Sequence, residues 1–167
     1  MVEASLLSRL SCLIVRQPYA SLIAFGKKRW EFRSYEVKKR GTIGIAASPN
    51  PPYPTKNVSL NRVATEFPRG VLLATADLVG CFYATAADLR KATTPPIEVS
   101  LHNHKILTVD SPIGEPKDDV VAAANSTTWE SYALELENVR PIQEHILVTP
   151  TSRSTWVFVE YTSESTQ

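Results

Sequence analysis

The stretch from Ser11 to Ile23 reads SCLIVRQPYASLI, and it contains two patterns that decide the fold. Its first part, Ser11–Arg16, is a short run rich in Leu, Ile and Val, which predicts a buried strand. Pro18 suits the first turn of a helix, where its missing N–H costs nothing. The residues that follow predict a helix over Tyr19–Phe25, which Gly26 ends in a left-handed conformation. A strand therefore turns directly into a short helix.

Most of the remaining chain indicates short strands. Arg29–Tyr35 alternates, so Glu31 and Arg33 are expected on one face of a strand. Further strands are expected in four apolar or alternating segments, namely Thr42–Ala47, Gly70–Phe82, Trp129–Val139 and Ser154–Tyr161. Short helices are expected at Val58–Phe67 and Ala86–Ala92. Because strands and helices do not alternate regularly, we expect an α+β fold that is mostly β, a small antiparallel or mixed barrel of about six strands with two or three flanking helices.

Proline-rich segments interrupt this pattern. Ser48–Lys56 holds four prolines and is expected to be an extended loop. Residues 93–127 hold four more and are expected to be an insertion or long loop, with a strand at His104–Val109. The polar tail, residues 162–167, is expected to be frayed. No repeat interrupts the 167 residues, so a single domain over residues 1–167 is expected.

Charge is concentrated in one segment. The whole chain has a net charge of +1, but seven basic and two acidic residues between Lys27 and Arg40 give that segment +5. Such a segment can meet a polyanion. It can equally be a solvated strand edge, where lysines block edge-to-edge pairing. Charge alone leaves both interpretations open.

Several classes of protein are disfavoured. Cys12 and Cys81 lack Cys-x-x-Cys spacing, which argues against a disulfide scaffold or zinc site and suits a reducing cytoplasm. His102 and His104 have no third ligand at a suitable spacing, so we expect no metal and no cofactor. The apolar runs fall far below the roughly 20 residues of a membrane span, and the first twelve residues lack a secretory pattern. We expect a cytoplasmic protein without a membrane partner.

Three motifs resemble the ASCH domain, the activating signal cointegrator homology family. Arg16–Ala20 reads Arg-Gln-Pro-Tyr-Ala, Gly26–Arg33 reads Gly-Lys-Lys-Arg-Trp-Glu-Phe-Arg, and a strand of small residues begins at Gly41. Weaker similarities follow in the family's order, at Gly70–Ala76 and Trp129–Pro141. The resemblance implies a PUA-like β-barrel with a helix beside a cleft, and it implies binding of nucleic acid, above all RNA.

The resemblance also implies which residues meet the RNA. Arg16 and Gln17 lie where a strand becomes a helix, and free N–H groups together with an arginine fork suit a phosphate there. Both side chains can instead satisfy only local backbone groups. Tyr19 can stack on a base. The complete set of expected nucleic-acid-binding residues is Arg16, Gln17, Tyr19, Lys28, Glu31, Arg33 and Arg153.

Two alternatives remain. Some small ASCH members hydrolyse acylated cytidine or cleave RNA, and here Lys28 and Glu31 would be the catalytic pair. Those members carry a threonine where this chain has Glu31, and a further acid, for which Asp77 and Asp88 are the candidates. We therefore expect binding rather than catalysis. The third interpretation is a protein-interaction module that uses the proline-rich loop.

Overall fold

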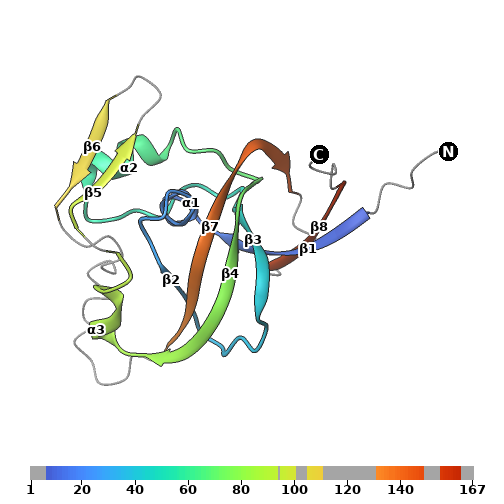
Figure 1. Ribbon diagram of the computed structural model, residues 1–167. Coiled ribbons are helices and arrows are strands. Elements are labelled where there is room, and N and C mark those ends of the chain that lie inside the picture. The colour runs from blue at the N-terminus through green and yellow to red at the C-terminus, as the bar shows by residue number, and fades with distance from the viewer. Residues whose placement is uncertain (1–6, 94, 101–104, 111–130, 149–154, 163–167) are drawn as a thin grey trace.

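Six strands form one curled sheet in the computed structural model, which describes residues 7–93, 95–100, 105–110, 131–148 and 155–162 (Figure 1). The strands are β1 (Leu7–Val15), β2 (Trp30–Arg33), β3 (Gly41–Ala47), β4 (Val71–Ala84), β7 (Ser131–Leu147) and β8 (Trp156–Thr162). Their order is β2-β7-β4-β3-β1-β8. β1 and β3 are parallel, and every other neighbouring pair is antiparallel. This mostly antiparallel sheet confirms the predicted fold class.

Three short helices and a hairpin complete the described structure. The helices are α1 (Tyr19–Ala24), α2 (Val58–Ala64) and α3 (Ala86–Leu89), and the hairpin is formed by β5 (Ile97–Ser100) and β6 (Ile106–Val109). Figure 1 shows α2 and the hairpin together at one end and α3 at another. Leu22 of α1 and Leu60 of α2 pack with Ile97 and Val109 of the hairpin. The hairpin is thus attached to the body through a small apolar core of its own.

The strand β1 is buried on both faces. Leu13 and Val15 pack in the main core with residues of α1, β3, β4 and β7. Leu10 and Cys12 point the other way, into a second core shared with β8. Burial on both faces explains why this part of the sequence is continuously apolar rather than alternating.

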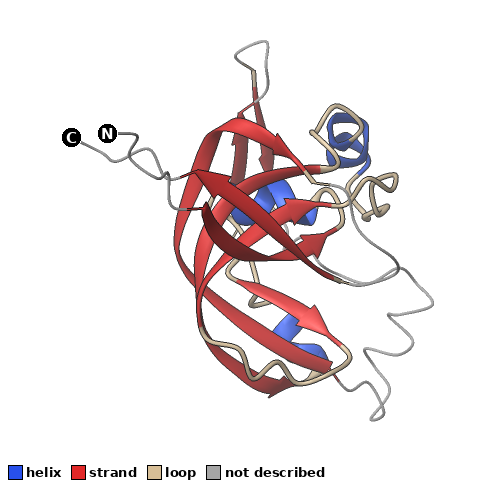
Figure 2. Ribbon diagram, turned by 90° about the vertical axis from the view of Figure 1, so that its right-hand side faces the viewer, coloured by secondary structure: helices blue, strands red, loops and turns tan. Residues whose placement is uncertain are grey.

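Figure 2 shows how the sheet curls, and polar side chains connect its two ends. Arg33 of β2 donates from Nη2 to the carbonyl of Ile14 in β1 at 2.7 Å. The hydroxyls of Tyr35 and Thr155 lie 2.6 Å apart, and Trp156 Nε1 donates to the Tyr35 hydroxyl at 3.2 Å. These contacts bring β2 next to β1 and β8, so the open sheet becomes an incomplete barrel.

Several sequence expectations need correction. No pattern indicated β5, which lies inside the predicted insertion. Val58, an apolar residue at the start of α2, is 65% exposed, and Leu60 and Ala64 are the buried positions of this helix. β7 continues past Val139, through a bulge where Asn138 has a positive φ of 49°. A bulge lets the strand contain Pro141, which cannot donate to a regular ladder.

Gly44 allows β1 and β3 to approach closely. It pairs with Cys12, and an added Cβ would collide with Cys12 Sγ and lie 2.8 Å from Leu72 Cδ1. We expect Gly44→Ala to lower the free energy of unfolding by about 1–3 kcal/mol, because overpacking forces neighbours to move. Urea denaturation measures this. Adding Cys12→Ala should recover part of the loss, and an unchanged midpoint for the single variant would show that the contact is not tight.

Candidate functional site

Lys28, Glu31 and Arg33 form a nearly buried ionic cluster at β2. The Lys28 ammonium donates to Glu31 Oε2, and Arg33 Nη1 donates to Glu31 Oε1 at 3.1 Å. The side chains of Lys28, Glu31 and Arg33 are 4%, 9% and 16% exposed. Glu31 and Arg33 share one face of the strand, as the alternation predicts. One carboxylate serves two cations, so the cluster has an excess positive charge.

The backbone fixes the position of this cluster. Gly26 ends α1 with a φ of +72°, and the amides of Lys27 and Lys28 donate to the carbonyl of Leu22 at 2.8 and 3.1 Å. This is a glycine-terminated helix end. Lys28 then pairs with Thr93 in an isolated bridge, and β2 pairs with β7. The lysine and its partners are therefore held from both sides.

Lys28 lies between aromatic rings. Its Nζ is 4.8 Å from the centroid of Tyr19 and 5.8 Å from that of Phe32. Burial lowers the pKa of Lys28, the charge and hydrogen bond of Glu31 oppose this, and the charge of Arg33 lowers it further. The net lowering means that Lys28 releases its proton more readily than a surface lysine does.

Arg16 and Tyr53 form a stacked pair nearby. The Arg16 guanidinium lies 4.7 Å from the centroid of the Tyr53 ring, and Arg16 Nε donates to the carbonyl of Pro51 at 2.6 Å. The Tyr53 amide donates to the carbonyl of Gln17 at 2.6 Å. Tyr53 is 47% exposed. The proline-rich loop thus presents an aromatic ring beside an arginine.

Tyr19 connects the stacked pair to the ionic cluster. Burial raises the pKa of Tyr19 to about 12, and the charges of Glu31 and Tyr53 raise it as well. Tyr19 follows Gln17, whose carbonyl accepts from the Tyr53 amide, by two residues, and the Tyr19 ring lies 4.8 Å from Lys28 Nζ. We call the combined set the candidate site, consisting of Arg16, Tyr19, Lys28, Glu31, Arg33 and Tyr53.

Gln17 lies inside the protein and has no exposed surface. Its Nε2 donates to Ser21 Oγ at 2.9 Å and to the carbonyl of Pro68 at 2.7 Å, and its Oε1 accepts from the Ser21 amide at 3.0 Å. The side chain therefore satisfies local groups, which is the alternative that the sequence left open. Gln17 joins α1 to the chain that precedes β4 and positions Arg16.

The remaining sequence candidates lie apart from the candidate site or outside the described residues. Asp77 accepts hydrogen bonds from Arg140, Asn138 and Thr42, and these bonds, with that of Arg140 first, lower its pKa to about 2. Asp88 caps α3 by accepting from the Thr85 amide at 2.8 Å. Both acids thus have other partners. Arg153, His102 and His104 lie outside the described residues.

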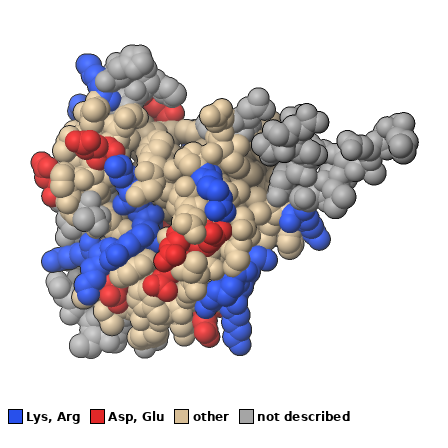
Figure 3. All heavy atoms as spheres, viewed as in Figure 1, with Lys and Arg blue, Asp and Glu red and all other residues tan. Residues whose placement is uncertain are grey.

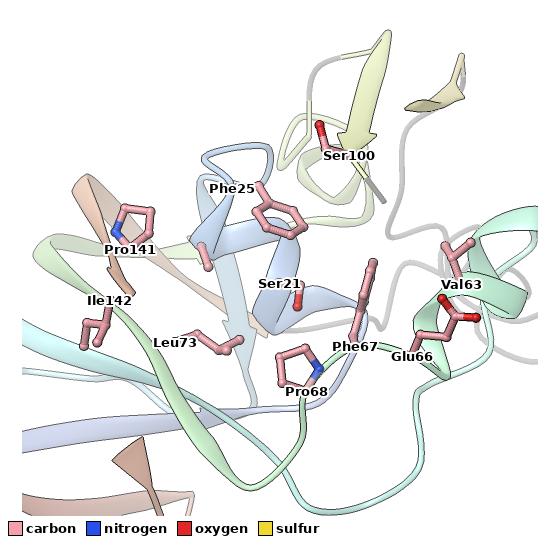
Figure 4. Close-up of a pocket in the computed structure, with 11 residues that line it drawn as sticks. Ser21, Phe25, Val63, Glu66, Phe67, Pro68, Leu73, Ser100, Pro141 and Ile142 are labelled. Carbon is pink, nitrogen blue, oxygen red and sulfur yellow. The ribbon is translucent and has the colours of Figure 1, made fainter. Parts of the chain in front are cut away.

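The described residues also contain a separate apolar pocket of about 330 Å³ (Figure 4). It is lined by Phe25, Phe67 and Ile142, among others, and its polar lining residues are Ser21, Glu66 and Ser100. Ser21 and Phe25 lie on the opposite face of α1 from Tyr19, because the helix turns 100° per residue. The pocket and the candidate site are therefore separated by α1.

The curled six-stranded sheet with α1 beside the ionic cluster defines a mostly-β protein. A sequence profile of the ASCH domain matches residues 13–143. The chain belongs to the ASCH domain family, and this confirms the resemblance carried by the motifs at Arg16–Ala20 and Gly26–Arg33.

Two curated relatives and two solved structures illustrate the similarity. Activating signal cointegrator 1 of Homo sapiens is 32% identical over 123 residues, and that of Mus musculus is 30% identical over the same length. Each match covers 64% of this chain and 21% of the relative, so the chain spans about a fifth of those proteins. Crystal structures of two ZmASCH mutants from Zymomonas mobilis are 15% identical, with TM-scores of 0.46 and 0.47. The two structural matches cover 82% and 83% of this chain, and 74% and 73% of the respective ZmASCH chains.

Two absences hold for the described part of the chain. None of its helices has the length and apolar character needed to cross a membrane. Among the same residues, no three His, Cys, Asp or Glu side chains are grouped in a way that would hold a metal ion.

Proposed function

We propose that this domain binds RNA through the candidate site. The observation that carries the proposal is an ionic cluster beside the Tyr19 ring, together with a stacked Arg16–Tyr53 pair at the turn that leads into Tyr19. Arg16, Lys28 and Arg33 supply the positive charge, and Glu31 is the only acid in the candidate site. Cations beside aromatic faces are the combination that single-stranded nucleic acid requires, because phosphates need charge and unpaired bases need a stacking surface.

Each side chain has a distinct role in this proposal. Tyr53, half-exposed and backed by Arg16, offers a ring face to a base. Lys28 and Arg33 attract phosphate, although Arg33 also holds the sheet closed. Each Glu31 oxygen receives one donor and has a second lone pair. Glu31 can therefore accept from an exocyclic base amine, as carboxylates do with cytosine N4.

Arg33 Nε supports a site that a ligand completes. It is buried and has no hydrogen-bond partner among the described residues. A buried donor without an acceptor is costly. A ligand oxygen or a water molecule that reached it would remove this cost.

Hydrolysis of an acylated cytidine is the second candidate function, and Lys28 favours it. A lysine that is 4% exposed, has a lowered pKa and contacts a carboxylate can take part in proton transfer. In that case Glu31 would exchange the proton with Lys28. Asp77 and Asp88, the candidates for the acid that small hydrolytic members use elsewhere, have the partners described above.

Two variants distinguish a binding site from a catalytic one. For binding alone, Lys28→Ala should weaken RNA binding by about 1 kcal/mol, or a few-fold, because one cation is lost. Glu31→Gln should bind as well or better, because it removes a negative charge. For catalysis, both variants should lower turnover of acylated cytidine by roughly 100-fold or more while affinity stays nearly constant.

The measurements are RNA affinity by fluorescence anisotropy and hydrolysis by chromatography, on variants whose circular dichroism matches the wild type. We expect wild-type affinity without turnover. Wild-type turnover that both variants abolish would establish the hydrolase instead. A stable protein complex without RNA binding would favour an interaction module.

We propose the cytoplasm as the site of action, since Cys12 and Cys81 are both free thiols.

A further inference from the structure

A second cationic surface lies just outside the candidate site. Lys27 and Arg29 flank the buried Lys28 in the chain, and both are exposed. Lys91, which follows α3, is 61% exposed. Figure 3 shows Lys and Arg side chains gathered on the side of the molecule where α3 lies. We call Lys27, Arg29 and Lys91 the outer basic patch.

Backbone contacts hold the two segments of the outer basic patch together. Arg29 donates from its amide to the carbonyl of Ala92 at 2.9 Å, and from Nε to the carbonyl of Lys91 at 3.0 Å. Lys28 pairs with Thr93 in the isolated bridge. The Arg29 guanidinium also lies 4.2 Å from the centroid of the Trp30 ring. Arg29 is therefore pre-positioned, which reduces the entropy lost when it binds an anion.

A hollow of about 250 Å³ lies within the outer basic patch. Gly26, Lys27, Arg29, Ala92 and Pro96 line it, so both of its charged lining residues are positive. Two acids are near. Asp88 caps α3 and lies 3.9 Å from Lys91, and Glu98 lines a neighbouring hollow with Lys27. Neither acid lines the hollow between Lys27 and Arg29.

We infer that the outer basic patch binds the phosphate backbone of an RNA strand that continues beyond the nucleotides held in the candidate site. The inference rests on the proposed function. Lys28 belongs to the candidate site, and neighbouring Cα atoms are 3.8 Å apart. Lys27 and Arg29 therefore lie directly beside the candidate site. Exposed cations around a concave surface hold phosphates and carry no base information. The outer basic patch should therefore make a longer RNA bind more tightly than a short one, whatever its base sequence.

The test compares two RNA lengths and two double variants of equal charge. Kd is measured by competition fluorescence anisotropy for unstructured 4- and 16-nucleotide RNAs, from 0.05 to 0.3 M salt. Lys27→Ser with Lys91→Ser removes two patch charges and keeps the backbone carbonyl that Arg29 uses. Lys38→Ser with Lys39→Ser removes two exposed charges from the connection between β2 and β3.

We expect the patch variant to weaken binding of the 16-nucleotide RNA by roughly 10-fold at 0.1 M salt and to reduce the salt slope by about 1.4. Binding of the 4-nucleotide RNA should change less than about twofold, since it fills only the candidate site. The control should change 16-nucleotide binding by less than about threefold, because its charges act only at long range. Equal losses for both variants, or equal losses for both RNAs, would overturn the patch and leave the proposed function intact. If neither RNA binds the wild type, the proposed function fails and the patch with it.

Discussion

Replacing Glu31 with Ala should lower the free energy of unfolding at pH 7 by about 3–5 kcal/mol, because it leaves two cations without their shared carboxylate. Lys28 and Arg33 are 4% and 16% exposed, so solvent screens them little. Among the described residues, Lys28 keeps its approaches to the rings of Tyr19 and Phe32. Breaking a buried ion pair by removing one partner is more harmful than replacing both.

The loss in Glu31→Ala should shrink as the pH rises. Burial lowers the pKa of Lys28 in the folded protein, and Glu31 is the group that raises it. Without Glu31 the folded pKa falls further below the roughly 10.4 of an unfolded chain. At a pH between the folded and the unfolded pKa of Lys28, the unfolded state binds a proton that the folded state has released. The free energy of unfolding of the variant therefore rises with pH, by up to about 1.4 kcal/mol per pH unit. This contribution is lost as the pH falls to the folded pKa, and below that value both states carry the proton and stability no longer changes.

Urea denaturation at pH 6, 7, 8 and 9 measures both effects. Asp77→Ala is the control, since it breaks the exposed ion pair with Arg140 and should cause a much smaller loss. The double variant Lys28→Met with Glu31→Gln should recover much of the stability that Glu31→Ala loses. Its stability should not show the rise with pH, because the Lys28 ammonium that titrates is gone. A Glu31→Ala midpoint within experimental error of the wild type would show that the ionic cluster is solvated.

Tyr53→Ala should reduce RNA affinity by roughly 5- to 150-fold, the equivalent of 1–3 kcal/mol for one stacked base. Tyr53 is 47% exposed and lies against Arg16, so a base can stack on it without displacing core residues. Stacking is not electrostatic. The loss should therefore be the same at every salt concentration.

Arg16→Ala should behave differently, because it removes a phosphate contact and lowers the salt slope by about 0.7. Tyr83→Ala is the matched control, since Tyr83 is 52% exposed on β4 and packs edge-on against Tyr132. It should bind RNA like the wild type. Equal losses for Tyr53→Ala and Tyr83→Ala would mean that neither ring stacks a particular base.

The features that the sequence predicted correctly are those that depend on residues close together in the chain. The strand-to-helix turn at Arg16–Ala20, the helix end at Gly26 and the shared face of Glu31 and Arg33 all follow from residues close in the chain. The sequence does not distinguish Tyr53 from the other tyrosines, because its contact with Arg16 spans 37 positions of sequence. Only the three-dimensional path of the proline-rich loop brings the two together.

Burial was the harder property to predict. Gln17 looked like a ligand contact, but its amide is used inside the protein by Ser21 and Pro68. The hydrogen bond to Pro68 spans 51 residues, so no local pattern could indicate it. Likewise β5 becomes a strand by pairing with β6 and packing on α1 and α2, which are tertiary effects.

A nitrogen–proton NMR titration of the wild-type protein with a 16-nucleotide unstructured RNA tests the central claim most directly, because it locates the bound strand residue by residue. We expect the largest concentration-dependent shifts at the amides of Arg16, Lys28, Glu31 and Tyr53, with small ones at Thr42, Asp77 and Asn138, which hydrogen-bond to one another outside the candidate site. Added salt should reverse them. Saturable shifts confined to Thr42, Asp77 and Asn138 or to the residues lining the apolar pocket, with the candidate site unaffected, would contradict the account.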